Sequence, residues 1–354
     1  MKAIGIVGWG GALVLAGTLG TAGCQPVSDQ PPAISDLRCS LPIALQRGEA
    51  GRQPVAMLLV HSGALAGERV GFVLEAGSQL YHSVDSPVLL GPEGSDHSFT
   101  TSYDRPFKRW LPVPRDQVSR DGSQYFYIAP HSLPGGDRVP VDYVFHVVDV
   151  RTGDERTITL HAQSVLGPAY HPVYFAREGI YVAEFGYEGP GPMGLYLLDL
   201  TTGMLDKVFD VDTVGAMGGG AAWLAHGNGD DPHAYISPYD GTITPNEVLR
   251  RDLTSGVTVS WFYRPGEFIT MLGLDFDHHP VVGVYRAASR GEDVWLVPAA
   301  RAGMRVGAFS ALTGVSSDSY GVWLGSDRGI YLYRRASGLA QVSKVAGTPA
   351  GTCS

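Results

Sequence analysis

The chain has 354 residues, of which 44% are hydrophobic and 17% are charged, so it is long and apolar enough to bury a large core and is not disordered. The net charge of −9, without any stripe of basic residues, argues against nucleic acid as a partner. The 47 glycines and 24 prolines interrupt short apolar runs, which favours strands and turns over helices.

Residues 1–23 have the features of a secretory signal peptide: one early Lys, an apolar Gly-rich run, and small residues before Cys24. The Ala-Gly-Cys ending resembles the lipobox of bacterial lipoproteins, and this resemblance implies that Cys24 is lipidated, with palmitate among its acyl chains. We therefore expect a bacterial extracytoplasmic protein that is anchored to the cell membrane, with residues 24–38 as a tether. If the lipobox is not used, the protein is secreted instead.

Two further cysteines, Cys39 and Cys353, flank the expected globular domain of residues 39–354. An exported protein folds in an oxidising compartment, where such cysteines pair. We predict a disulfide between them, which the chain-entropy relation places at roughly 4–5 kcal/mol of stabilisation because the loop is so long.

A short pattern occurs three times and sets the expected architecture. In 148–153, 197–203 and 250–256 an apolar strand end is followed by Asp, further residues including Thr or Ser, and Gly, and the glycines are 50 and 53 residues apart. A period near fifty in a chain of short strands is the signature of a β-propeller. We read Asp149, Asp199 and Asp252 as turn residues whose carboxylates accept hydrogen bonds from backbone amides.

The rest of the chain divides into units of similar length, so we predict an all-β fold with a single β-propeller of four-stranded antiparallel blades. Six blades are expected, and seven is the alternative if 41–68 and 69–104 are separate units. The six units are 54–104, 109–160, 163–210, 213–262, about 269–306 and 311–343.

Two segments resemble propeller repeats of known families. In the last unit Asp318, Gly321, Trp323 and Tyr331 match the repeat of two-component sensor periplasmic domains. The Ser-Arg-Asp-Gly-Ser segment at 119–123 is similar to the Ser-Pro-Asp-Gly turn of Tol-type propellers. Both resemblances imply the fold and neither implies an activity.

Candidate functional residues gather where the repeat is broken. The connections from second to third strands lie on one face of a propeller, and two of them, 130–140 and 227–245, are unusually long. The ligand-face candidates, which we place in these connections or elsewhere on or near the same face, are His131, His171, Glu184, Tyr187, His226, Asp230, Asp231 and His233. His and carboxylate side chains suit Ca²⁺ or another divalent metal, but no spacing matches a dedicated metal motif, so no cofactor is evident and no metal ligand is assigned. The Asp275–Pro280 segment falls at a first hairpin, where Asp and Pro have turn roles.

No catalytic residue is assigned, because the chain has no Gly-x-Ser-x-Gly motif and Cys39 and Cys353 have a structural explanation. We expect a monomeric, non-catalytic module that binds a protein or a cell-envelope glycan through its long-loop face. The alternative is a propeller hydrolase or lyase that acts on a sugar, lactone or peptide, with a metal or carboxylates at the channel mouth.

Overall fold

The computed structural model describes residues 33–46, 50–76, 80–92, 100–132, 140–161, 169–185, 192–210, 213–236, 243–285 and 291–354. All of them belong to one compact unit, Pro32–Ser354. The predicted signal peptide, with Cys24, lies outside these residues. In the described ranges, neither of the two short 3-10 helices, η1 (Ile34–Asp36) and η2 (Arg115–Gln117), has the length or apolar character needed to cross a membrane.

Four blades follow the predicted pattern of four antiparallel strands in chain order. Blade 3 consists of β11 (Ala169–Phe175), β12 (Ile180–Phe185), β13 (Pro192–Leu198) and β14 (Leu205–Phe209). Blade 4 consists of β15 (Thr213–Gly218), β16 (Ala221–His226), β17 (Glu247–Asp252) and β18 (Thr258–Tyr263). Blade 5 consists of β19 (Phe268–Leu274), β20 (Pro280–Tyr285), β21 (Glu292–Leu296) and β22 (Met304–Phe309). Blade 6 consists of β23 (Leu312–Asp318), β24 (Gly321–Ser326), β25 (Gly329–Arg334) and β26 (Gly338–Ser343).

The two remaining blades are less regular. Blade 2 pairs β8 (Gln124–Ser132), β9 (Pro140–Asp149) and β10 (Glu155–His161), and an isolated bridge from Val118 to Tyr125 stands where an inner strand would be. Pro112 and Pro114 precede that bridge and cannot donate to a strand ladder, which explains the missing strand. A hairpin of β6 (Ser102–Asp104) and β7 (Arg109–Leu111) lies just before this segment in the chain.

Blade 1 contains both ends of the domain. Its strands are β27 (Gly347–Pro349), β1 (Ser40–Leu45), β2 (Arg52–Leu59) and β3 (Ala64–Leu74), and the same sheet continues into β4 (Leu80–Ser83) and β5 (Leu90–Pro92). The last strand therefore lies beside the first, with Ile43 opposite Pro349 and Leu45 opposite Gly347. This shared blade closes the ring.

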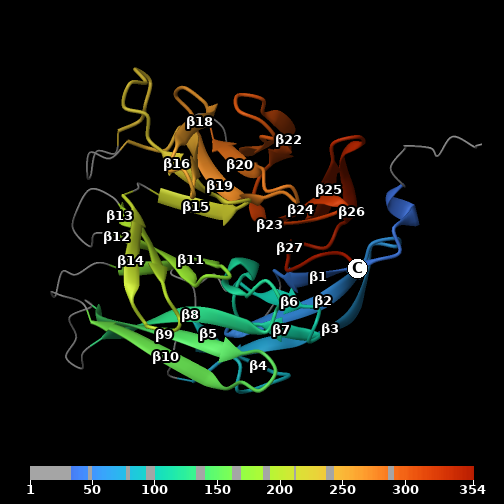
Figure 1. The fold of residues 1–354 in the computed structure, drawn as a ribbon. Coiled ribbons are helices and arrows are strands. Elements are labelled where there is room, and N and C mark those ends of the chain that lie inside the picture. The colour runs from blue at the N-terminus through green and yellow to red at the C-terminus, as the bar shows by residue number, and fades with distance from the viewer. Residues whose placement is uncertain are drawn as a thin grey trace, which may run out of the picture. The chain divides into compact units, whose positions relative to one another are not determined.

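The blades contact one another in sequence, through inner strands except in blade 2, where β8 makes the contact. β11 touches β8 and β15, β19 touches β15 and β23, and β23 touches β27 (Figure 1). Buried apolar clusters fill the spaces between adjacent blades; one of them joins Phe126 and Phe145 of blade 2 to Ile180 and Val182 of blade 3. The predicted six-bladed propeller is thus confirmed, and the seven-bladed alternative is not needed.

The predicted disulfide is also present. Cys39 and Cys353 are bonded, with their Cα atoms 5.4 Å apart, and both are buried. Asp318 belongs to the segment of the last unit that resembles a known propeller repeat. Its Oδ2 atom accepts hydrogen bonds from the Cys353 amide at 2.7 Å and from the Trp323 indole at 2.8 Å. Asp318 therefore connects blade 6 to the disulfide between Cys39 and Cys353.

The three recurrent Asp residues have the predicted turn role. The Oδ1 atom of Asp149 accepts hydrogen bonds from the amides two and three residues later, and Asp199 and Asp252 do the same. The glycine that ends each turn has φ between 70° and 77°, a conformation that side chains with a Cβ disfavour. These turns join third to outer strands, so they lie on the face opposite the long loops.

Candidate functional site

The long-loop face is the end of the propeller where second strands connect to third strands and outer strands connect to the next blade. Its best-described long connection follows β16 and returns to β17, and 227–236 and 243–246 of it are described. Ile236 and Ile243 form a bridge, and the Thr244 amide donates to the Tyr235 carbonyl at 2.9 Å. The connection is therefore a hairpin rather than an irregular loop.

Asp231 holds this hairpin on the propeller. Its side chain is 6% exposed; Oδ2 accepts hydrogen bonds from Asn246 Nδ2 at 2.7 Å and from the Gly266 amide at 2.9 Å, and Oδ1 accepts one from the His233 amide. The Tyr263 hydroxyl donates to the same carboxylate. Burial alone would raise the pKa of Asp231, but these hydrogen bonds hold it below its ordinary value. Asp231 is thus a structural anchor, a role that its type and spacing did not reveal.

The anchored hairpin presents apolar side chains to solvent. Tyr235 is 64% exposed and Ile236 is 58% exposed. At the start of the next blade, Phe268 is also exposed and packs against Tyr285 with ring centroids 5.7 Å apart. Large apolar side chains exposed on a fixed loop, as Tyr235 and Ile236 are, are typical of a contact surface.

Of the other candidates from the sequence, some lie on this face and the rest lie outside the residues that the structure describes. Asp230 and His233 are exposed on the hairpin, and His226 lies at its base, opposite Glu247 in the strand register. His171 and Glu184 lie in blade 3 at the ends of β11 and β12 that point to the same face. His131 belongs to β8, but its side chain is not described, and Tyr187 lies outside the described residues.

Three buried carboxyl groups occupy equivalent ends of consecutive blades. Glu184, Glu247 and Glu292 are 7%, 8% and 4% exposed, and each lies beside a connection from a second to a third strand. Burial, and then the hydrogen bond with Glu184, raise the pKa of Tyr196 to about 12. Burial raises the pKa of Glu292 above its ordinary value, although Tyr285 and Thr270 donate hydrogen bonds to it. Each described partner belongs to the same blade as its carboxyl group.

The described ranges contain one group of three side chains with the composition of a metal site. Asp275, Asp277 and His279 bring their ligand atoms within 4.8 Å of one another. They lie in the β19–β20 hairpin, opposite the long-loop face, and Arg335 of blade 6 donates to Asp275 at 2.9 Å and lies 2.9 Å from His279 Nδ1. Asp275 Oδ1 also accepts the amides of Asp277 and His279, which is the predicted turn role. The guanidinium therefore takes the position that a cation would need.

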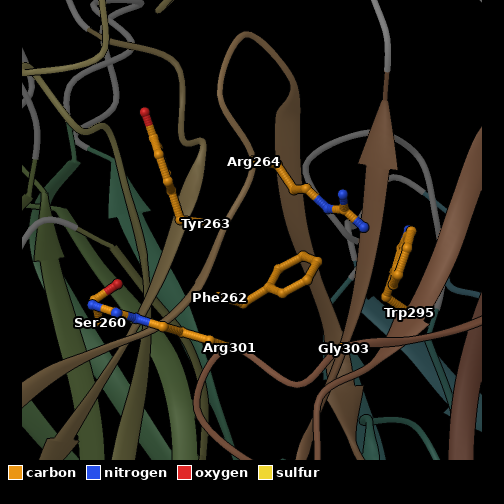
Figure 2. A pocket seen from close by; sticks show the side chains of 7 residues that line it. All are labelled: Ser260, Phe262, Tyr263, Arg264, Trp295, Arg301 and Gly303. Atoms are coloured by element: carbon orange, nitrogen blue, oxygen red, sulfur yellow. The ribbon is translucent and has the colours of Figure 1, made fainter.

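A pocket that sequence reasoning missed lies between blades 4 and 5 (Figure 2). Its volume is about 370 Å³, and it lies between β18 and the β21–β22 hairpin. The residues that line it are Ser260, Phe262, Tyr263, Arg264, Trp295, Arg301 and Gly303. These residues come from separate segments and form no motif, so only the packing of two blades brings them together.

No protein-family model matches the chain, and no curated protein matches it. Solved structures of similar fold include an oligogalacturonate lyase in complex with manganese, with 12% identity and a TM-score of 0.47 over 88% of this chain and 79% of that one. TolB from Acinetobacter baumannii has 9% identity and a TM-score of 0.45 over 91% of this chain and 68% of that one. A putative 6-phosphogluconolactonase from Bacteroides fragilis has 11% identity and a TM-score of 0.44 over 91% and 99%. At such identities the likeness concerns the fold alone, and the strand order of the chain itself carries the propeller assignment.

Proposed function

We propose that this protein is a non-catalytic binding module, held on the extracytoplasmic side of a bacterial membrane through Cys24, that contacts a protein or cell-envelope ligand with its long-loop face. The observation that carries the proposal is the β16–β17 hairpin. Asp231 fixes it to the propeller, and Tyr235 and Ile236 are exposed on it. A contact surface that is already ordered loses little conformational entropy on binding, so each buried side chain contributes more to affinity.

Site-specific photocrosslinking tests this surface with an internal control. Ile236 and Val257 are both 58% exposed, but Val257 lies in the β17–β18 turn on the opposite face. A photoreactive amino acid at position 236, in the bacterium that expresses the protein, should give one discrete crosslinked species, and the same group at 257 should not. Equal crosslinking at both positions, or crosslinking at 257 alone, would contradict the proposal.

The membrane anchor is tested separately. Cys24→Ala should move the protein from the membrane fraction to the soluble extracytoplasmic fraction, and mass spectrometry of the N-terminal peptide should detect the acyl chains in the unmodified sequence only. A protein that fractionates identically with and without Cys24 is not lipid-anchored. In that case the binding surface can still be correct, because the two experiments share no variant.

The alternative proposal is an extracytoplasmic hydrolase or lyase, and one observation favours it: Glu184, Glu247 and Glu292 are buried near the long-loop face of three consecutive blades. Carboxyl groups of this kind serve glycosidases and metal sites. Purified protein that carries stoichiometric metal, lost on Asp230→Ala or His233→Ala, would favour the enzyme. Metal-free protein that still forms the position-236 crosslink would favour the binding module.

A further inference from the structure

The pocket between blades 4 and 5 is lined by a cationic side chain, that of Arg264, which packs against two aromatic rings. The guanidinium carbon of Arg264 lies 3.9 Å from the centroid of the Trp295 ring and 5.2 Å from that of Phe262. The backbone on both sides is fixed as well, since the Arg264 amide donates to the Asn246 carbonyl at 2.9 Å and the Glu267 amide donates to the Arg264 carbonyl. A stacked guanidinium keeps its plane and its hydrogen-bonding edge in a defined orientation.

The hydrogen-bonding edge of Arg264 is available to a ligand. Its Nε atom is buried without a hydrogen-bond partner, its side chain lines the pocket, and within the described residues its terminal nitrogens donate no side-chain hydrogen bond. Among the described residues Arg264 takes part in no ion pair, and the same holds for Arg301. No described carboxylate therefore neutralises either guanidinium through an ion pair.

Arg301 supplies the second cation from the neighbouring blade. It has φ of 62°, and its amide donates to the Trp261 carbonyl at 2.7 Å, which fixes the β21–β22 hairpin against β18. The hairpin approaches so closely that a Cβ on Gly303 would lie 2.6 Å from the Phe262 ring. In the view of Figure 2, Phe262 separates the two guanidinium groups. The pocket thus has a cation toward each end and an aromatic wall between them.

We infer that this pocket binds a small organic carboxylate, with the carboxylate on the terminal nitrogens of Arg264 and the body of the molecule against Phe262 and Tyr263. A planar guanidinium matches a carboxylate through two parallel hydrogen bonds. A second oxygen-bearing group of the same molecule lies within the reach of Arg301 and the Ser260 hydroxyl. The volume of about 370 Å³ suits a molecule of the size of a sugar acid or an aromatic acid. The inference does not depend on the proposed function of the long-loop face.

Titrations of the purified protein with matched probes, at constant ionic strength, test the site. Glucuronate and glucose share a ring but differ in the carboxylate, and benzoate carries the carboxylate on an apolar ring. We expect saturable binding of glucuronate or benzoate, followed by tryptophan fluorescence and calorimetry, and no binding of glucose. Glucuronate as the tighter ligand indicates a sugar acid, and benzoate indicates an aromatic acid. Failure of both to bind, or equal binding of inorganic sulfate, overturns the inference.

Variants assign the binding to the two arginines. Arg264→Gln should weaken binding by about tenfold or more, because a hydrogen bond to a charged group is lost, and Arg301→Gln should weaken it less. Arg156→Gln removes the same charge from an exposed position in blade 2 and should bind as the unmodified protein does. If Arg264→Gln fails to fold, Arg264→Lys keeps the charge but not the planar edge and should still bind several-fold more weakly. Equal affinities for the Arg264 and Arg156 variants overturn the assignment.

Discussion

Removal of the Cys39–Cys353 disulfide should destabilise the propeller strongly, because the bond closes almost the whole domain. For the observed 314-residue separation, the chain-entropy relation gives about 5.7 kcal/mol at 25 °C, somewhat more than the roughly 4–5 kcal/mol expected from the sequence and above the upper end of about 5 kcal/mol for single disulfides. The native fold keeps other contacts across the closure: β27 still pairs with β1, and the Ser40 amide still donates to the Ser354 carbonyl at 3.0 Å. The reduced protein should therefore fold, but with a smaller free energy of unfolding.

The expected change can be measured as a melting temperature. A domain of this length has an unfolding entropy of about 0.67 kcal/mol/K, so a loss of about 4–6 kcal/mol lowers Tm by about 6–9 °C. We would compare residues 32–354 with the Cys39→Ser, Cys353→Ser double variant by near-UV circular dichroism. The double variant provides its own control, since a reducing agent should lower the Tm of the unmodified protein and leave that of the variant unchanged.

One result would refute this reasoning. If the oxidised protein and the double variant melt within about 1 °C of each other, while mass spectrometry shows the disulfide intact in the former, the cross-link does not restrict the unfolded chain as the relation requires. The contacts of β27 and Asp318 would then be sufficient to close the ring.

Three further predictions concern polar groups that neither the crosslinking nor the titration tests. Asp318→Ala leaves the buried Trp323 and Cys353 donors without their acceptor and should cost about 2–4 kcal/mol in chemical denaturation, whereas Asp252→Ala, at an exposed turn, should cost much less. The pKa of Glu292 is raised in the folded protein, so the native state binds a proton more tightly than the unfolded chain does, and stability should fall as pH rises from the ordinary value of 4.5 through the raised pKa. Glu292→Gln should remove that part of the pH dependence of Tm, and an unchanged pH profile would contradict the burial argument. Because Arg335 already contacts Asp275, a chelator should leave Tm unchanged, and a lower Tm after chelation would show that a metal competes with the guanidinium.

The architecture could be predicted because its determinants are local and repeated. Asp149, Asp199 and Asp252 each specify a turn through hydrogen bonds within four residues, so their spacing reports the length of a blade. The disulfide could be predicted because ring closure brings the ends of the domain together. The strand that completes the closure could not, because Gly347–Pro349 has only three residues, too few for a pattern of side chains to indicate a strand.

The candidate sites were harder to predict because they depend on contacts between distant residues. Composition marked Asp231 as a ligand candidate, yet its partners Asn246 and Gly266 lie 15 and 35 residues away and use its carboxylate for structure. Likewise, Arg264 and Trp295 stack across a blade interface and share no motif. A carboxylate or an arginine in a loop has the same sequence signal whether it is buried in a network or available to a ligand.

Tyr263 shows why the two proposed binding surfaces need separate variants. Its ring lines the pocket between blades 4 and 5, while its hydroxyl donates to Asp231, which anchors the hairpin of the long-loop face. A substitution at Tyr263 therefore alters both surfaces, and a loss of binding in that variant would not show which of them was responsible. Ile236 and Arg264 belong to one surface each, so crosslinking at the first and titration at the second can fail independently.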